Sequence, residues 1–378
     1  MIPITTSLTQ KLGEPPRRAE ERLFDVQSGL KTPIVSAPMG SIATPAMAAA
    51  VTAGGGFGCI GAAFDSTADL KTKIHKVRDS LDVLPGEPVP LAVGFIGWIL
   101  DTTEKTENPR IPATLDERPS AIWLAFGTDL TPHIAAVRAH DKKSGRMTLI
   151  FVQVGTVADA LRYAPLVDCI VVQGTEAGGH GSSIAPPLFS LLQAVLRAIP
   201  PSATSPIVLA AGGISTGAQI AALLTMGAAG VVVGTRFLFT VEAAYPQDKK
   251  DALIKADLNA TVRTLVYDEV NRTMGWPPLH DGRAIRNRVM DDFEEGLSLD
   301  ERLRRFDESK EKGEDDRLVI WAGVGAGLTN EIMPVAVSAS VWPSILFLCA
   351  YDAVHQDVLR ELHEEAVEKL SGVALLLN

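Results

Sequence analysis

A histidine that directly follows two glycines is the feature of this sequence best suited to chemistry. The stretch QGTEAGGHGSS begins at Gln173 and places His180 after Gly178 and Gly179, at the end of an apolar run. Glycine lets a ligand approach the backbone closely because it has no side chain. Histidine titrates near neutral pH and can act as a general base or as a hydrogen-bond donor. We expect this stretch to meet a bound molecule, in preference to a histidine that only packs in the core.

Two further glycine sites have the pattern of a phosphate-binding site. AAGGIS places Gly212 and Gly213 before a helix for which Ser215 is the expected N-cap, and VVVGTRF places Gly234 and Thr235 after the next apolar run. In α/β barrels the loops after the seventh and eighth strands often bind phosphate through backbone N–H groups and a helix N-terminus. Two ordinary turns are the alternative, and the occurrence of both sites together favours phosphate.

Other glycine motifs lack the context that their functions need. GFGCIG, which begins at Gly56, matches the letters of the dinucleotide fingerprint, but that fingerprint opens a helix after a strand. Here a helical segment precedes the motif, and the motif itself has the composition of a strand. GVGAG, which begins at Gly323, lacks the same frame, and no G-K-[ST] triplet of a P-loop occurs. No H-E-x-x-H motif or cluster of Cys and His residues predicts a metal site.

Eight short apolar runs are the elements that would position these residues. Most are apolar throughout, as strands buried on both faces are, and segments with a helical pattern separate them. Strands that alternate with helices over about two hundred residues predict an α/β fold, a (β/α)8 TIM barrel. An open, doubly wound sheet is the alternative. The runs begin at Thr32, Gly56, Leu91, Ser120, Leu149, Cys169, Ile207 and Gly230.

The composition of the chain changes after the eighth run. Residues 246–317 are rich in charge and helical in pattern, without repeated strands, which predicts a helical insertion with solvated faces. The apolar character then returns in LVIWAGVGAGL, and a last helical pattern runs from about Val354 to Leu370. We therefore expect a barrel over residues 1–245, a helical domain over residues 246–317, and a C-terminal segment over residues 318–378 that returns to the barrel.

Charge and cysteine content restrict the binding partners and the cellular compartment expected for the protein. The formal net charge of the 378 residues is −10, which argues against nucleic acid or an anionic membrane as a partner. Cys59, Cys169 and Cys349 are far apart, which suggests reduced thiols, and the last two lie in apolar runs typical of a core. No N-terminal signal core and no apolar run of membrane-spanning length occurs. We expect a cytoplasmic protein, and its oligomeric state stays open, with a homodimer as one option.

Flavin mononucleotide (FMN) has the shape to extend from the expected phosphate site to the histidine loop. With its phosphate at the glycines of AAGGIS and VVVGTRF, its flat ring would cross the barrel mouth and pass Gly178 and Gly179. The SAPM stretch of the first run can meet the ring edge. Gln153 and Gln173 end the fifth and sixth runs and can reach the ring or the ribitol, or serve as structural amides instead. The expected contacts are Ala37, Pro38, Met39, Gln153, Gln173, Gly178, Gly179, Gly212, Gly213, Gly234 and Thr235.

The sequence resembles the nitronate monooxygenase family, formerly called 2-nitropropane dioxygenases. The matching motifs are SAPMG, VQGTEAGGHG, LAAGGIS, GAAGVVVGTRFL, RTMGWPP with DGRAIRN, and WAGVG, and they cover most of the chain. The resemblance implies an FMN-binding barrel with an added helical domain. It also implies that His180 is the catalytic residue and that Val232 and Val233 join Gly213, Gly234 and Thr235 at the phosphate.

Two positions depart from the pattern of this family. Phe95 stands in LAVGFIGW where the family often has an asparagine that contacts the flavin. Gly181 and Ser182 follow His180, where the family frequently has an H-x-G ending. The flavin edge and the substrate pocket are therefore expected to differ from those of other members.

The function implied by the resemblance is FMN-dependent oxidation of alkyl nitronates, and optionally of nitroalkanes, with O2 to a carbonyl product and nitrite. His180 would stabilise the anionic nitronate, or act as general base on the C–H group of a neutral nitroalkane. The expected partners are thus a small-molecule substrate and O2. Two alternatives stay open: an FMN-dependent enoyl-thioester reductase that uses NAD(P)H, and a flavin-binding protein or secondary-metabolism flavoenzyme on the same scaffold.

Overall fold

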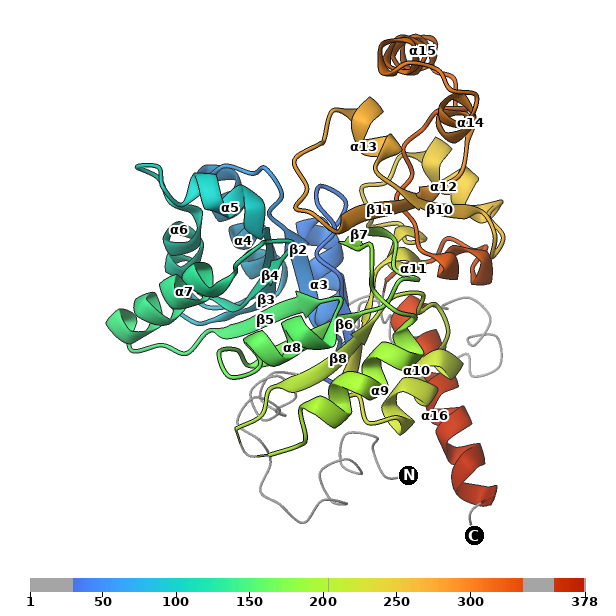
Figure 1. Ribbon diagram of the computed structural model, residues 1–378. Helices are drawn as coiled ribbons and strands as arrows, with labels where there is room; N and C mark the ends of the chain where they lie inside the picture. The colour runs from blue at the N-terminus through green and yellow to red at the C-terminus, as the bar shows by residue number, and fades with distance from the viewer. Residues whose placement is uncertain (1–29, 203, 336–356, 377–378) are drawn as a thin grey trace, which may run out of the picture.

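Eight parallel strands form a barrel at the centre of the molecule (Figure 1). The computed structural model describes residues 30–202, 204–335 and 357–376. Within them the strand order is β1-β9-β8-β6-β5-β4-β3-β2. A parallel bridge between Val35 and Phe57 joins the two ends of this order, so the sheet closes on itself. The predicted α/β fold, a (β/α)8 TIM barrel, is confirmed.

The eight apolar runs are the strands of this barrel, and helices alternate with them. The strands are β1 (Ile34–Ser36), β2 (Gly58–Gly61), β3 (Val89–Ile96), β4 (Pro119–Ala125), β5 (Leu149–Val154), β6 (Cys169–Gln173), β8 (Ile207–Ala211) and β9 (Gly230–Val233). The helices are α3 (Pro45–Ala53), α4 (Thr67–Ser80), α5 (Gly97–Thr103), α6 (Arg110–Asp116), α7 (Thr131–Ser144), α8 (Val157–Tyr163), α9 (Leu188–Ala198), α10 (Gly217–Thr225) and α11 (Thr235–Leu238).

Side-chain caps begin several of these helices where the sequence predicts them. Thr44 caps α3, with a proline at the first helical position, and Ser66 caps α4 in a reciprocal capping box. The cap of α10 differs from the prediction, because Thr216 and not Ser215 accepts the hydrogen bond from the first turn. The Ser215 hydroxyl donates instead to the carbonyl of Gly325, 2.8 Å away.

The core has two layers, one inside the barrel and one between the strands and the helices. The interior is filled by aromatic rings such as Trp123 and Phe151, whose centroids are 5.8 Å apart. Cys59 and Cys169 are buried in the same layer. Burial raises the pKa of both thiols, which keeps them protonated and unreactive. The predicted core position of Cys349 lies outside the described residues.

A three-stranded antiparallel sheet connects the insertion to the barrel. It consists of β10 (Thr261–Thr264), β11 (His280–Ile285) and β7 (Gly179–Ser182), of which β7 belongs to the loop after β6. Residues 246–317, for which helices without repeated strands were predicted, thus contain two short strands, which pair with a strand that the barrel supplies. The division at residues 245 and 317 stays a prediction. The insertion also contains α12 (Gln247–Ile254), α13 (Val266–Asn271), α14 (Arg288–Glu294) and α15 (Leu299–Lys312).

The C-terminal segment contains a 3-10 helix, η2 (Val324–Leu328), and the helix α16 (Val358–Leu376). Figure 1 shows α16 beside α10 of the barrel. Leu362 and Ala366 of α16 are buried there, and the backbone N–H of Gly217 donates to Glu365 at 2.7 Å. The predicted start of this helix near Val354 lies outside the described residues.

Candidate active site

A cavity of about 600 Å³ opens at the C-terminal ends of the barrel strands. Ligand pockets commonly have volumes of roughly 300–1,000 Å³, and the active sites of TIM barrels lie at this end. Every predicted site residue except Val233 lines this cavity; the side chain of Val233 packs in the outer core layer. The predicted residues among those that line it are Ala37, Pro38, Met39, Gln153, Gln173, Gly178, Gly179, His180, Gly212, Gly213, Val232, Gly234 and Thr235.

The ends of β8 and β9 form a cradle of backbone N–H groups. Gly212 and Gly213 have φ values of 114° and 71°, a region that favours glycine. The N–H groups of Gly212, Gly213 and Gly234 donate no hydrogen bond to any residue that the structure describes. Since backbone N–H groups inside proteins are almost always paired, these three groups are suited to an anionic ligand.

The GVGAG segment, which lacked a recognisable role in the sequence, closes one side of this cradle. Gly325 lines the cavity, and a Cβ atom there would lie 2.8 Å from the carbonyl oxygen of Gly213. The N–H of Gly323 donates to the hydroxyl of Thr235 at 2.9 Å. The Ser215 hydroxyl donates to the carbonyl of Gly325. Thr235 and Ser215 therefore hold the GVGAG segment in place through hydrogen bonds to its backbone.

The two glutamines predicted at the flavin occupy different environments. Gln173 donates from Nε2 to the carbonyl of His180 at 3.3 Å, so it supports the histidine loop. Gln153 makes no side-chain hydrogen bond within the described part of the chain, and its amide is free to bind a ligand. The alternative of a structural amide therefore describes Gln173 better than Gln153.

Phe95 changes the cavity less than the sequence suggests. Its ring packs in the outer core layer, and the Arg110 guanidinium lies 5.3 Å from the ring centroid. Gly94 and Ile96, its neighbours in β3, are among the residues that line the cavity. Phe95 also lines the cavity, and it brings an apolar ring and no polar group to that part of the wall.

A buried carboxylate that the sequence did not reveal holds His180. The Nε2 atom of His180 lies 2.9 Å and 3.0 Å from the two carboxylate oxygens of Asp268, whose side chain is 0% exposed. Oδ1 of Asp268 also accepts from the hydroxyl of Thr273 at 2.8 Å and from the indole N–H of Trp276 at 3.0 Å. Because an ionised carboxylate only accepts hydrogen bonds, Nε2 of His180 carries the proton.

The other ring nitrogen of His180 is therefore the one available for chemistry. Nδ1 of His180 makes no hydrogen bond to the described residues, and the residue lines the cavity. In the neutral ring this atom has the lone pair and can accept a proton. Once protonated, it can donate a hydrogen bond to an anion while Asp268 balances the new charge.

Two tryptophans fix the plane of the His180 ring. Trp276 stacks on it with centroids 3.5 Å apart and an angle of 8° between the planes, and Trp321 lies at 4.5 Å and 53°. Gly282 faces His180 across the β7–β11 pair, and a Cβ atom there would be 2.4 Å from the Trp321 ring. The glycine of DGR is thus required for the close approach of the strand and the indole.

The partners of His180 had weak signals in the sequence. Asp268 follows His180 by 88 positions and lies in the segment for which exposed helix and loop were predicted. Trp276 and Trp321 belong to RTMGWPP and WAGVG, motifs that carried the family resemblance without an assigned role. Those motifs were the available signal for the tryptophans, and no spacing pattern pointed to Asp268.

Searches for two other kinds of feature found none in the described ranges. No group of three or more His, Cys, Asp or Glu side chains there is arranged to hold a metal ion. No helix in those ranges combines the length and the apolar character needed to cross a membrane.

Comparisons with known proteins identify the family of this chain. The family model for nitronate monooxygenase matches residues 21–86 and 100–337. A nitronate monooxygenase of Neurospora crassa is 30% identical over 365 residues, which cover 90% of this chain and 90% of that protein. Another, from Metarhizium robertsii, is 33% identical over 329 residues, or 81% and 89% of the two chains. The crystal structure of nitroalkane oxidase from Streptomyces ansochromogenes shares the fold, with a TM-score of 0.68, 23% identity, and 92% and 99% of the two chains covered.

Proposed function

Since the chain belongs to the nitronate monooxygenase family, we propose that it uses FMN and O2 to oxidise alkyl nitronates, and also neutral nitroalkanes, to a carbonyl product and nitrite. The protein is a flavin-type oxidoreductase by this membership. The observation that carries the proposal is one cavity that contains both the Asp268-bound His180 and the N–H cradle of Gly212, Gly213 and Gly234. The comparisons support the reaction class, and the site geometry supports the roles of the residues.

FMN fits the residues present in the cavity. The N–H groups of the cradle suit a terminal phosphate, which they can bind without a side chain in the way. Gly179 has a φ of 65° and nothing within 4 Å of the position where a Cβ would stand, so the wall there leaves room for a flat ring. When bound, FMN supplies the redox chemistry by accepting two electrons, which O2 then removes.

His180 positions the reacting group beside the flavin-binding wall. An alkyl nitronate has negative charge on its nitro oxygens, and Nδ1 of a protonated His180 can donate a hydrogen bond to them. With a neutral nitroalkane, Nδ1 of the neutral ring removes the acidic C–H proton. In both cases Asp268 accepts from Nε2 and keeps the ring in the productive tautomer. Trp276 covers one face of the ring, which restricts the access of water.

Anaerobic bleaching of the bound flavin tests this reaction. We expect the nitronate of nitroethane to reduce the flavin of the purified protein, and we expect NADH and NADPH not to reduce it. Absorbance near the flavin band, followed without O2, measures both. Rapid bleaching by NAD(P)H, with none by the nitronate, would instead favour the enoyl-thioester reductase alternative.

Replacing Asp268 with asparagine is expected to lower kcat with retention of FMN. The amide removes the charge that balances a protonated His180 and no longer fixes the tautomer. Hydrogen bonds to charged groups contribute about 1.5–3 kcal/mol, so we expect a loss of about 10- to 100-fold. Steady-state O2 consumption and the flavin content measure the two effects.

Asp292→Asn is the matched control for this variant. Asp292 is also a buried carboxylate of the insertion, but its partners are Arg305 and Arg317. If Asp268→Asn and Asp292→Asn lower kcat equally, Asp268 has only a structural role.

A further inference from the structure

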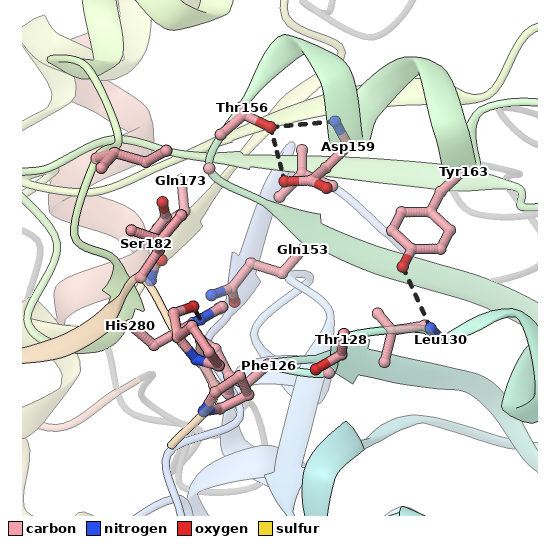
Figure 2. A pocket seen from close by; sticks show the side chains of 17 residues that line it. Phe126, Thr128, Leu130, Gln153, Thr156, Asp159, Tyr163, Gln173, Ser182 and His280 are labelled. Carbon is pink, nitrogen blue, oxygen red and sulfur yellow. Dashed lines mark hydrogen bonds between the residues drawn. The ribbon is translucent and has the colours of Figure 1, made fainter.

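A second chamber, of about 250 Å³, adjoins the active-site cavity (Figure 2). It lies over the ends of β4, β5 and β6, and the segment Pro277–His280 contributes to its wall. Phe126, Gln153 and Gln173 line both this chamber and the active-site cavity. These three side chains therefore form the wall between the two spaces.

Phe126 links this wall to the His180 assembly. Its φ of 59° lies in the left-handed region, which residues other than glycine rarely adopt. Backbone strain of this kind concentrates at functional sites. The Phe126 ring meets Trp276 edge-on at 5.4 Å, and it meets His280 at 6.1 Å on the side of the second chamber. Since Trp276 stacks on His180, a substrate at His180 lies next to the entrance of the chamber.

The second chamber presents polar groups with unused hydrogen-bonding capacity. Figure 2 shows Gln153 pointing from β5 toward Phe126 and His280. The hydroxyls of Thr128 and Ser182 make no hydrogen bond within the described ranges. Asp159 binds the Thr156 hydroxyl through Oδ2 at 2.6 Å, which leaves Oδ1 free. These groups can form hydrogen bonds with a polar ligand that enters the chamber.

Two aromatic side chains extend this polar set. The Tyr163 hydroxyl accepts from the N–H of Leu130 at 3.2 Å, and its own proton is free. Burial raises the pKa of Tyr163, so the hydroxyl remains a donor. Nδ1 of His280 lies 3.1 Å from the carbonyl of Pro278, which leaves Nε2 as a possible acceptor. The chamber thus offers both donors and acceptors.

The charge of the wall selects among polar ligands. Asp159 is acidic, and neither lysine nor arginine is among the described residues that line the chamber. Arg162 lies over the Tyr163 ring, but its guanidinium pairs with Asp129 at 2.7 Å. An anion in the chamber would face Asp159 without a counter-charge, whereas an ammonium group would gain a charge-assisted hydrogen bond.

We propose that this chamber is a specificity subsite that binds the distal ammonium group of a substrate whose reacting carbon lies at His180. The inference rests on the proposed function, because it takes the His180 cavity as the place of reaction. The substrate chain passes the wall of Phe126 and Gln153, and its distal group meets Asp159. A distal hydroxyl binds less strongly, and a distal carboxylate is disfavoured.

A series of primary 1-nitroalkane nitronates tests the subsite in the holoenzyme. The probes have increasing chain length and end in an amine, a hydroxyl, a carboxylate or a methyl group. At the length that reaches Asp159, we expect kcat/KM for the amine to exceed that for the methyl group about 10-fold, as a hydrogen bond to a charged group implies. Asp159→Asn should remove this preference and leave nitroethane unaffected. Equal kcat/KM for all four ends at every length would overturn the proposal, as would a preference that survives Asp159→Asn.

Two further variants separate recognition from stability. Asp248→Asn is the matched control, because Asp248, like Asp159, is an acidic residue in the first turn of a helix, and it lines neither cavity. It should keep the amine preference. Thr128→Val removes a hydroxyl of the chamber and leaves the cap of α8 intact. It should lower kcat/KM for the amine and hydroxyl probes relative to kcat/KM for the methyl probe. If Asp159→Asn fails to fold, an unchanged preference in Thr128→Val counts against the subsite.

Binding without turnover distinguishes failure of the subsite from failure of the proposed function. Aminoalkanoates and simple alkanoates have a carboxylate where the substrate has its nitronate, and they cannot reduce a flavin. Calorimetry should show that the aminoalkanoates bind more tightly than the simple alkanoates, and Asp159→Asn should remove this difference. Such binding in a protein that oxidises no nitronate would contradict the reaction but retain the subsite. Turnover of nitronates without any end-group preference would contradict the subsite alone.

Discussion

Replacing His180 with asparagine is expected to abolish most turnover while FMN stays bound. General acid–base groups typically contribute about 100- to 10,000-fold to rate, and asparagine has no titratable nitrogen in the place of Nδ1. The expected FMN-binding cradle, at Gly213 and Gly234, belongs to other strands, so cofactor binding should persist. Stopped-flow measurement of anaerobic flavin reduction gives the rate in the parent and the variant.

The loss should be larger with neutral nitroethane than with its preformed nitronate, because only the neutral compound requires removal of a proton from carbon. His133→Asn is the matched control, since His133 forms a similar pair with Asp101 at 2.9 Å outside the active-site cavity. That variant should keep the parent rate. Unchanged reduction of both substrates in His180→Asn would exclude His180 from the mechanism and leave its loop a structural feature.

Gly234→Val is expected to yield a folded protein without FMN. A Cβ atom at Gly234 would lie 3.5 Å from the Cβ of Ala37 and 3.8 Å from the sulfur of Met39, which are ordinary contacts. The φ of Gly234 is −109°, outside the left-handed region that favours glycine. The fold should therefore accept valine, while its branches occupy the space before the free N–H groups of the cradle.

Denaturation followed by chromatography measures the cofactor, and we expect stoichiometric FMN from the parent and none from Gly234→Val. The control is Gly372→Val, because Gly372 lies on an exposed part of α16 with no atom near the new Cβ. Gly213 is a less informative position, since its φ of 71° strains any side chain and a Cβ would lie 2.9 Å from Glu176. Retention of FMN by Gly234→Val would place the phosphate elsewhere, and release of FAD from the parent would refute the cofactor assignment.

The barrel and the set of residues at its mouth were determined by the sequence itself. Strands buried on both faces are continuous apolar runs, so LIFVQV and CIVVQ can be recognised locally as β5 and β6. Parallel strands bring their C-terminal ends to one rim. That rule places Gln153, Gly213 and Gly234 around one cavity without any knowledge of the distances between them.

Only the tertiary structure decided what surrounds His180 and where the second chamber lies. The strands β10 and β11 are short and contain Arg263 and Arg283, so they have no apolar run that marks them locally. Their pairing with β7 brings Asp268 to His180, and the burial of Asp268 depends on the separate core that the insertion forms. The chamber likewise combines positions from the loop after β4, from α8 and from β11. Contacts between distant segments leave no periodic pattern in either segment, because local periodicity records only which face of an element is buried and not what it is buried against.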